Sequence, residues 1–282
     1  MVIDEFVEMI IDKKELRGIN KELAKEITQQ WLSENPEIKE AYLQDPEKFP
    51  RTKEYNQLRS DVREQLRKIY GVFFTSKYNA KKEGYVQELI KADNEQTRQD
   101  LLKLHRSSAE RLATYPLLYQ QLFAITNQPT SILDLGCGFN PFAYPYLGCK
   151  PSYHCADIAC EDLKLIKQYL DSQNINNSIH CIDLSKPENI KQLPKADIAF
   201  AFKLFDSLED REFNITEQIL EAIPADILIA SFPTKSIGQK KTIGDRVWFE
   251  KLITGKELAR VTLSNEQFYV ITLTGKERVT HQ

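Results

Sequence analysis

The fold of this chain is decided by one segment, Ser131-Ile132-Leu133-Asp134-Leu135-Gly136-Cys137-Gly138-Phe139-Asn140-Pro141. Its apolar residues predict a short buried strand over 131–135, and the glycines predict a sharp turn where a ligand can approach the backbone. A strand that runs through such a turn into a helix opens a nucleotide-binding α/β unit. Pro141 stands where the dinucleotide pattern G-x-G-x-x-G has its third glycine, so the remaining pattern is D-x-G-x-G, beginning at Asp134.

Alternating strands and helices follow this motif. We expect strands over 131–135, 152–158, 178–184, 197–204 and 226–231, helices over 161–172, 209–223 and 245–253, and a final hairpin of 260–264 and 267–273 around Asn265-Glu266. Five βα units and a hairpin predict a seven-stranded, mostly parallel sheet whose last strand is antiparallel. The D-x-G-x-G form is typical of S-adenosylmethionine (SAM) methyltransferases rather than of NAD enzymes. The expected class is therefore an α/β, Rossmann-like class I SAM methyltransferase.

The residues before this motif favour helices. Apolar spacing predicts helices over 5–11, 21–32 (capped by Asn20), 52–70, 86–105 and 110–123, the last broken near Pro116. No strand-like alternation precedes residue 130. We therefore expect a helical domain over 1–104 and a SAM-binding domain over 105–282, in which 105–128 is a helical connector to the cofactor site.

The bulk composition narrows the class of protein. The chain has 282 residues, 41% of them hydrophobic, and a net charge of -3. It contains no run of the about 20 apolar residues that cross a bilayer, and its N-terminus lacks a signal-peptide pattern. Five cysteines without C-x-x-C predict neither a disulfide framework nor a zinc site, and the four histidines lack metal spacing, so we expect a cytoplasmic protein without a metal.

Positive charge is concentrated in one part of the helical region. Between residues 51 and 82, nine Lys or Arg face three acids, a local charge of 9 − 3 = +6. Arg59, Arg63 and Arg67 recur every four residues and so share one helix face. Two interpretations stay open: a solvated helix face, or a surface that follows the phosphates of a nucleic acid.

The candidate cofactor residues lie where the expected strands end, because ligands of open α/β sheets bind at the carboxyl ends of the strands. Gly136 and Gly138 would let the backbone approach the methionine part of the cofactor. Asp157 follows Gly138 by 19 residues, the place of an acid that binds ribose hydroxyls. Asp183 either faces the adenine amino group or caps the next turn. Lys203 ends an apolar strand, where a lysine favours a role in the site.

The residues after the fourth strand limit the reaction. Lys203-Leu204-Phe205-Asp206 stands where enzymes that methylate an adenine amine have D-P-P-Y or N-P-P-Y, and no Pro-Cys nucleophile for cytosine carbon occurs there. Cys137 lies inside the glycine turn and is expected to pack there. A ring nitrogen such as guanine N7 has a free lone pair, so its methylation needs alignment and charge stabilisation but no base.

Four segments together resemble the aminoglycoside-resistance family of 16S rRNA methyltransferases, which methylate guanine N7 in the decoding-site helix of the 30S subunit. These segments are H-R-S-S-A-E-R-L at 105–112, D-L-G-C-G-F-N-P-F-A at 134–143, F-K-L-F-D-S-L-E at 202–209 and S-F-P-T-K-S at 231–236. The forms G-C-G-x-N-P and S-F-P-T-K are narrower than the glycine turn alone. The likeness covers residues from about 100 to 250.

The resemblance implies roles for particular residues. Arg111 would pair with the cofactor carboxylate, since a guanidinium fits that group with two parallel hydrogen bonds. The implied cofactor residues are Arg111, Asp134, Gly136, Cys137, Gly138, Asp157, Ile158, Asp183 and Leu184. The residues implied beside the methyl group and the base are Lys203, Ser231, Phe232 and Lys235. The implied RNA contacts are Arg59, Arg63, Arg67, Lys240, Lys241 and Arg246.

The leading hypothesis is a SAM-dependent guanine-N7 methyltransferase that acts as a monomer on assembled 30S particles. Two alternatives stay open. The protein could methylate a small molecule, with its helical half as a lid. It could also be a ribosome-binding factor that has kept the fold but not the reaction.

Overall fold

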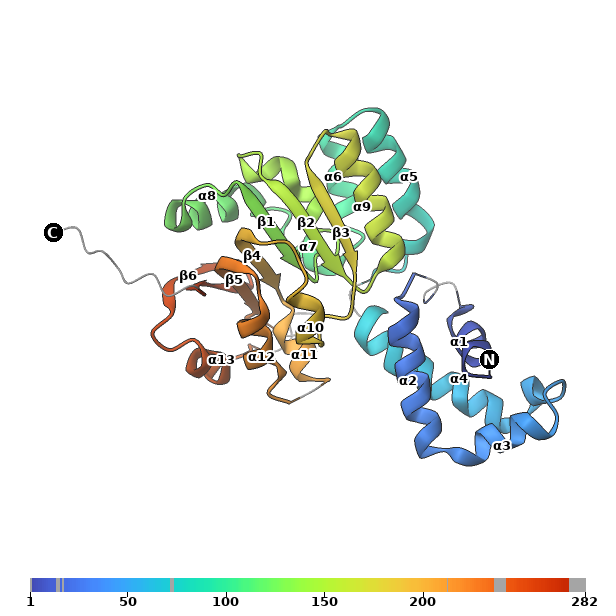
Figure 1. Cartoon of the computed structure of the whole chain (residues 1–282). Coiled ribbons are helices and arrows are strands. Elements are labelled where there is room, and N and C mark those ends of the chain that lie inside the picture. The colour runs from blue at the N-terminus through green and yellow to red at the C-terminus, as the bar shows by residue number, and fades with distance from the viewer. Residues whose placement is uncertain are drawn as a thin grey trace.

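A seven-stranded sheet forms the centre of the computed structural model, which describes residues 2–13, 16, 18–71, 74–211, 213–235 and 242–273 (Figure 1). The strands are β1 (Ser131–Leu135), β2 (Ser152–Asp157), β3 (Asn177–Cys181), β4 (Ala196–Phe202), β5 (Ala225–Pro233), β6 (Glu257–Leu263) and β7 (Glu266–Thr272). Their order is β3-β2-β1-β4-β5-β7-β6, with β1 to β5 parallel and β7 antiparallel to both of its neighbours. This confirms the predicted sheet and its fold class.

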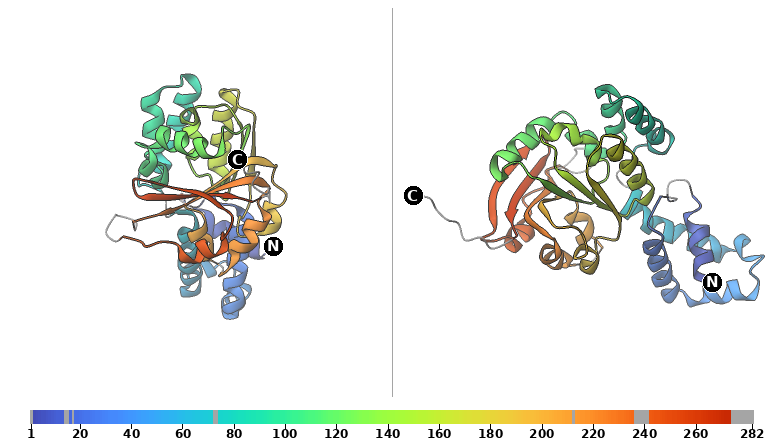
Figure 2. Two further views of the ribbon diagram at one scale, coloured as in Figure 1. Left: turned by 90° about the vertical axis from the view of Figure 1, so that its left-hand side faces the viewer. Right: turned by 45° about the horizontal axis from the view of Figure 1, so that its top comes forward.

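Helices cover both faces of the sheet (Figure 2). On one side or at its edge are α5 (Tyr78–Lys91), α6 (Glu95–Leu102), α7 (Arg106–Arg111), α8 (Tyr115–Thr126), the 3-10 segment η3 (Asn140–Leu147) and α9 (Cys160–Ser172). On the other are α10 (Pro187–Ile190), α11 (Phe205–Glu209), α12 (Ile215–Ala222) and α13 (Val247–Leu252). Successive strand residues point to opposite faces, so Ile132 and Leu133 of β1 belong to different apolar clusters.

The remaining helices form a separate N-terminal body, the described residues from 2 to 71, beside one end of the sheet (Figure 1). It contains α1 (Val2–Ile11), α2 (Lys21–Glu34), α3 (Pro36–Gln44), the 3-10 turn η1 (Phe49–Arg51), α4 (Lys53–Leu66) and the π-helical turn η2 (Arg67–Gly71). Its own apolar cluster includes Phe6, Leu23 and Leu58. The Asn20 side chain accepts a hydrogen bond from the amide of Leu23, which confirms the predicted cap.

Helices α5 and α6 belong with the sheet rather than with the N-terminal body. Val86, Leu89 and Leu101 pack in the cluster that covers one face of the sheet. The boundary predicted after residue 104 therefore falls after two helices whose apolar side chains are buried against the sheet.

Several predicted elements differ in their bounds. The helix expected over 86–105 is interrupted, because the Asn94 side chain caps a second helix by accepting from the amide of Thr97 at 2.8 Å. The helix expected over 110–123 is broken as predicted, but over 112–114 rather than near Pro116, which lies in the first turn of α8. Of the helix expected over 209–223, residue 209 ends α11 and residues 215–222 form α12. The 3-10 segment η3 replaces a regular helix after the glycine turn. The final turn is Ser264-Asn265, not Asn265-Glu266, which makes Glu266 the first residue of β7.

One cysteine pair departs from the prediction of no disulfides. A disulfide joins Cys160 and Cys181, whose Cα atoms are 5.2 Å apart. Cys181 pairs with Asp157 across β2 and β3, so the two cysteines meet only when those strands align. Within the described ranges no helix is long and apolar enough to cross a membrane.

Candidate functional site

A cleft opens at the carboxyl edge of the sheet, where the strand order reverses between β1 and β4. Its empty space is about 890 Å³ with the open mouth included. The cleft brings together Gly136, Asp157, Asp183 and Lys203 from the ends of four strands. It is also lined by Asp134, Cys137, Gly138, Ile158, Leu184 and Arg111. The predicted cofactor residues thus share one site.

The glycine turn forms the floor of this cleft. Gly136 and Gly138 have φ angles of +64° and +47°, a backbone region that disfavours other residues. A Cβ atom on Gly136 would lie 2.9 Å from the Leu204 side chain, and one on Gly138 would lie 3.0 Å from the His105 ring. The positive φ angles therefore favour glycine at both positions, and a Cβ would also crowd Leu204 or His105.

Asp157 closes one side of the turn. Its Oδ2 accepts a hydrogen bond from the amide of Gly138 at 2.9 Å, and its Oδ1 accepts from the amide of Ala159 at 3.0 Å. Burial raises the pKa of Asp157, although these two amides oppose the shift. Each carboxylate oxygen keeps a further lone pair for another donor. The expected meeting of Gly138 and Asp157 in one cleft is confirmed.

Asp134 supports the turn from beneath. Its Oδ2 accepts hydrogen bonds from the Asn140 amide at 2.8 Å and from the Tyr153 hydroxyl at 2.6 Å. Burial raises the pKa of Asp134 to about 6 in spite of these donors. Asn140 and Tyr153 were absent from the predicted site. The Asn-Pro step after the turn was the available signal for Asn140, whereas Tyr153 reads as an ordinary strand residue.

The Asp183 carboxylate forms an ion pair with Arg211, a residue that the sequence did not indicate. Arg211 donates to its two carboxylate oxygens at 2.9 and 2.8 Å, and the amide of Ser185 donates to Oδ1 at 2.9 Å. Burial alone would raise the pKa of Asp183, but the Arg211 fork outweighs it and lowers that pKa. Asp183 thus caps the following turn, as one alternative predicted. It also lines the cleft, and its contact with adenine stays a prediction.

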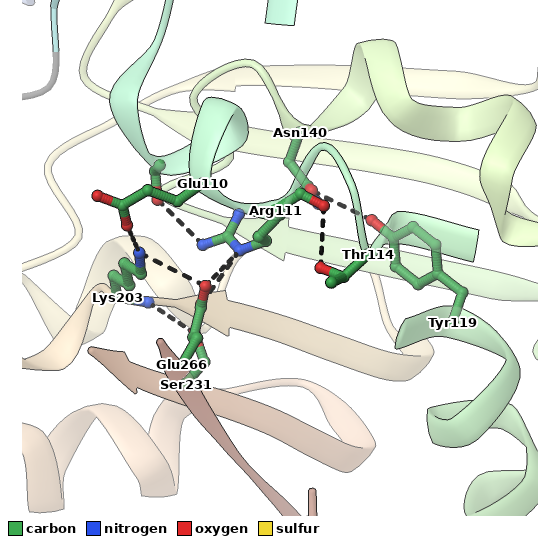
Figure 3. A network of polar contacts seen from close by, with 9 residues as sticks. Glu110, Arg111, Thr114, Tyr119, Asn140, Lys203, Ser231 and Glu266 are labelled. Carbon is green, nitrogen blue, oxygen red and sulfur yellow. Dashed lines mark hydrogen bonds and ion pairs between the residues drawn. The ribbon is translucent and has the colours of Figure 1, made fainter. Parts of the chain in front are cut away.

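A buried charge cluster lies at the other end of the cleft (Figure 3). Arg111 Nε donates to Glu266 Oε1 and Oε2 at 3.1 and 2.9 Å. Lys203 Nζ lies 3.5 Å from Glu266 Oε2 and forms an ion pair with half-exposed Glu110. Ser231 Oγ donates to Glu266. The cluster therefore holds two cations and two carboxylates from the region of α7, the end of β4 and the start of β7.

The electrostatics of the cluster favour the charged forms of Glu266 and Arg111. Burial alone would raise the pKa of Glu266, but Arg111 and Lys203 outweigh it and lower that pKa. Burial alone would likewise lower the pKa of Arg111, but the Glu266 carboxylate reverses the direction. Burial and these two cations lower the pKa of His105 to about 3, so its ring is neutral near pH 7.

Lys203 is held in an uncommon backbone conformation. Its φ is +57°, and its amide donates to the carbonyl and the hydroxyl oxygens of Ser231 at 3.0 and 3.1 Å. Non-glycine residues rarely adopt this region, and such strain concentrates at functional sites. The conformation carries the Lys203 side chain out of β4 toward Glu110 and Glu266.

The structure corrects the expected places of Ser231 and Phe232. Ser231 is fully buried and bonds to Glu266 and Lys203 from beneath the cleft. Phe232, the next residue of β5, points to the opposite face and packs against Phe249. Phe232 is 1% exposed there and does not line the cleft, contrary to its expected place beside the base. Lys235 is exposed, and its backbone forms an isolated antiparallel β-bridge with Thr242.

The expected RNA-binding arginines are not equivalent. Arg63 is only 9% exposed and donates to the backbone carbonyls of Met9 and Ile10 at 2.9 and 2.8 Å. Its expected phosphate contact is therefore wrong, because its guanidinium ties α4 to α1. Arg59 and Arg67 are partly exposed. Arg246 forms an ion pair with Asp206. Lys240 and Lys241 lie outside the described residues.

The sequence also missed Glu266 and Glu110. Glu266 was assigned to the hairpin turn, where a glutamate is unremarkable, and it reaches Arg111 across 155 positions. Glu110 lies in a helical segment where only Arg111 drew attention. Their burial or pairing follows from contacts between distant elements, for which one sequence carries no local signal.

The cleft fits an adenosine-based cofactor. The glycine cradle excludes side chains, an acid with unused lone pairs ends β2, and the apolar residues Ile158 and Leu184 flank the same space. This site on a sheet of order 3-2-1-4-5-7-6 defines a class I SAM-dependent methyltransferase.

Comparison with known proteins gives the family. The chain belongs to the family described as "Ribosomal RNA methyltransferase (FmrO)", whose model matches residues 54–270. It is 28% identical over 240 residues to the 16S rRNA (guanine(1405)-N(7))-methyltransferase of Proteus mirabilis, covering 77% of this chain and 84% of that protein. The enzyme of the same name from Micromonospora echinospora is 26% identical over 219 residues, covering 73% and 79%.

Solved structures agree with the fold. The 16S rRNA methyltransferase RmtF, in complex with S-adenosyl-L-homocysteine, aligns with a TM-score of 0.75 at 21% identity over 96% of this chain and 98% of that one. The 16S rRNA methylase ArmA aligns with a TM-score of 0.56 at 26% identity over 68% and 97%.

Proposed function

We propose that this protein transfers the methyl group of SAM to N7 of a guanine in 16S rRNA within the 30S subunit. The charge cluster at the end of the cleft is the observation that carries the proposal. Glu110 and Glu266 are both engaged by Lys203, and Glu266 also by Arg111. Carboxylates held in ion pairs are poor general bases, which suits a nucleophile whose lone pair is already free. The names of the relatives support the same target class.

Different residues of the cleft bind different parts of the cofactor in this proposal. Arg111 takes its carboxylate, and the backbone of Gly136 and Gly138 follows its methionine part. Asp157 accepts hydrogen bonds from the ribose hydroxyls, while Ile158 and Leu184 flank the adenine. When bound, SAM supplies an electrophilic methyl group.

The charge cluster meets the target base. Lys203 lies at the junction of the cleft and the cluster. Methylation of N7 gives the purine a positive charge, and the half-exposed carboxylate of Glu110 offsets that charge as it develops, while buried Glu266 holds Arg111 and Lys203 in position. Fixed ion pairs keep these groups in place, so little reorganisation is needed during transfer.

The N-terminal body docks on the rRNA in this proposal. Exposed or partly exposed cations remain on and beside α4: Arg51, Lys53, Arg59, Arg67 and Lys68. Cations of this kind bind phosphates and release counterions. Lys235, Lys240, Lys241 and Arg246 extend the contact near the target base. We expect a cytoplasmic monomer, with the N-terminal body as the docking region.

Methylation of purified 30S subunits tests the proposal. Labelled SAM should transfer its methyl group to 16S rRNA in 30S particles, and borohydride–aniline cleavage should locate one 7-methylguanine. Asp157→Ala is the inactive control. Expression of the wild-type chain, but not of this variant, should raise the aminoglycoside concentration that inhibits growth. Label in a soluble metabolite would favour the small-molecule alternative. An absence of binding at millimolar SAM would favour a non-catalytic ribosome-binding factor.

A further inference from the structure

The N-terminal body supplies one wall of the cofactor cleft. Ile69 and Tyr70, from η2 at the end of α4, line the same cavity as Asp157 and Ile158. Phe74, just beyond η2, lines it as well. Ile69 also packs against the apolar cluster of the N-terminal body, and so does Ile158 from the sheet. The adenosine end of the cleft therefore lies at the contact between the two parts of the chain.

Backbone hydrogen bonds attach the body to the same rim. The amide of Asn20 donates to the carbonyl of Ile158 at 2.8 Å, and Ile19 forms an antiparallel bridge with Ala159. The Asn20 side chain also donates to the carbonyl of Cys181, at the end of β3, at 3.1 Å. The residues that directly follow Asp157 are thus bonded to the start of α2, and a displacement of the body would displace them.

A series of aromatic contacts continues from this wall to the glycine turn. The Tyr70 and Phe74 ring centroids are 4.8 Å apart, Phe74 stacks on Tyr78 at 3.9 Å, and Tyr78 lies 5.1 Å from Phe139. Tyr70 is 5% exposed, and its hydroxyl lies so close to Gly18 that a Cβ there would approach it to 2.6 Å. The Tyr70 ring is therefore fixed by neighbours on both sides.

We propose that Ile69 and Tyr70 are cofactor-binding residues, and that cofactor binding and the seating of the N-terminal body on the sheet stabilise each other. The inference rests on the proposed SAM site. Coupling of this kind is reciprocal, because a ligand that contacts both parts favours the arrangement in which they meet. The N-terminal body that is proposed to dock on rRNA thus also supplies the residues that contact the adenosine of the cofactor.

Calorimetry with S-adenosylhomocysteine on the full-length chain tests the wall. Ile69→Ala removes apolar contact from the cleft and should raise the Kd about five- to tenfold. Ile27→Ala is the matched control, since Ile27 is also partly buried against the same cluster but does not line the cleft. It should change the Kd less than about twofold, while thermal unfolding shows a similar loss of stability in both variants. An unchanged Kd for Ile69→Ala, or an equal rise in both variants, would overturn the proposal.

Hydrogen exchange of the wild-type chain gives a second readout. Addition of S-adenosylhomocysteine should slow exchange of the Asn20 amide, whose acceptor is Ile158, and of the amides of η2. No protection at these positions would contradict the coupling. A wild-type chain that binds the ligand and shows these effects without methylating 30S subunits would refute the proposed target and leave the wall intact.

Discussion

The N-terminal body and the carboxyl edge of the sheet both bury an arginine, but they give it different partners. Arg63 is 9% exposed and donates to two neutral backbone carbonyls, whereas Arg111 is 4% exposed and donates to the Glu266 carboxylate. Burial alone does not separate them. The bonds of Arg63 to α1 hold two helices together. The bond of Arg111 to Glu266 instead places a pair of charges beside the cleft, where a ligand can meet them.

This difference predicts what each side chain would leave behind if it were removed. Without Arg63, two carbonyl groups of α1 lose hydrogen bonds. Without Arg111, a buried carboxylate loses its main counter-charge, and burial then favours protonation of Glu266. Variants at the two positions should therefore separate stability from activity.

The largest effect is expected for Arg111→Ala. We expect its kcat/KM for 30S methylation to fall about a thousandfold, because the variant loses the proposed carboxylate contact and the charge balance of the cluster. Steady-state methylation of 30S subunits measures the effect, with circular dichroism to show that the fold is retained. Arg63→Ala is the comparison, and its folded fraction should keep its activity. Full activity of Arg111→Ala would refute the assignment.

A smaller effect concerns the pH dependence of stability through Asp134. Its folded-state pKa is raised to about 6, above its value in the unfolded chain, so the folded state binds the proton more tightly. Protonation of Asp134 therefore adds up to about 3 kcal/mol to the free energy of unfolding below about pH 4. This stabilisation is lost as the pH rises to about 6. Urea unfolding from pH 4 to 7 should show this decline in the wild-type chain.

Asp134→Asn is the control for that measurement. Both donors to Asp134 reach Oδ2, so the carbonyl oxygen of an asparagine can accept both hydrogen bonds. The difference in the free energy of unfolding, wild type minus Asp134→Asn, should then fall as the pH rises from 4 to 6. A difference that stays constant with pH would contradict the raised pKa.

Arg63→Ala should lower the free energy of unfolding by about 2 kcal/mol, since two hydrogen bonds from a charged donor to backbone carbonyls are lost. Arg63→Lys, which keeps the charge but not the fork, should restore only part of this stability. Thermal or urea unfolding measures both variants. If the Arg63→Ala variant instead lost affinity for 30S subunits at unchanged stability, Arg63 would be an RNA-binding residue.

The smallest effect is expected for reversal of exposed charge on the N-terminal body. Arg51→Glu combined with Lys53→Glu should weaken 30S binding about three- to tenfold, with a reduced dependence on salt and an unchanged Kd for SAM. Lys195→Glu is the matched control, because this exposed lysine precedes β4 at the amino edge of the sheet. Equal losses in both variants would indicate a nonspecific charge effect.

The sequence by itself determined the elements that depend on neighbouring residues. The apolar run, the two glycines and the acid at a spacing of 19 predicted a strand, a turn and their common cleft, and the structure joins Gly138 to Asp157 at 2.9 Å. The Asn20 cap was predicted for the same reason. Strand alternation, glycine φ angles and caps are short-range properties, so a single sequence carries them.

Only the tertiary structure decided which charged side chains are buried and with what. Arg63 meets α1 across 53 positions, and Arg111 meets Glu266 across 155. Cys160 reaches Cys181 only through the pairing of β2 with β3, and Ile69 reaches the cleft only when the N-terminal body is in place. A helical period of four fixes a shared face, but whether that face meets solvent or a neighbouring helix depends on packing between distant elements.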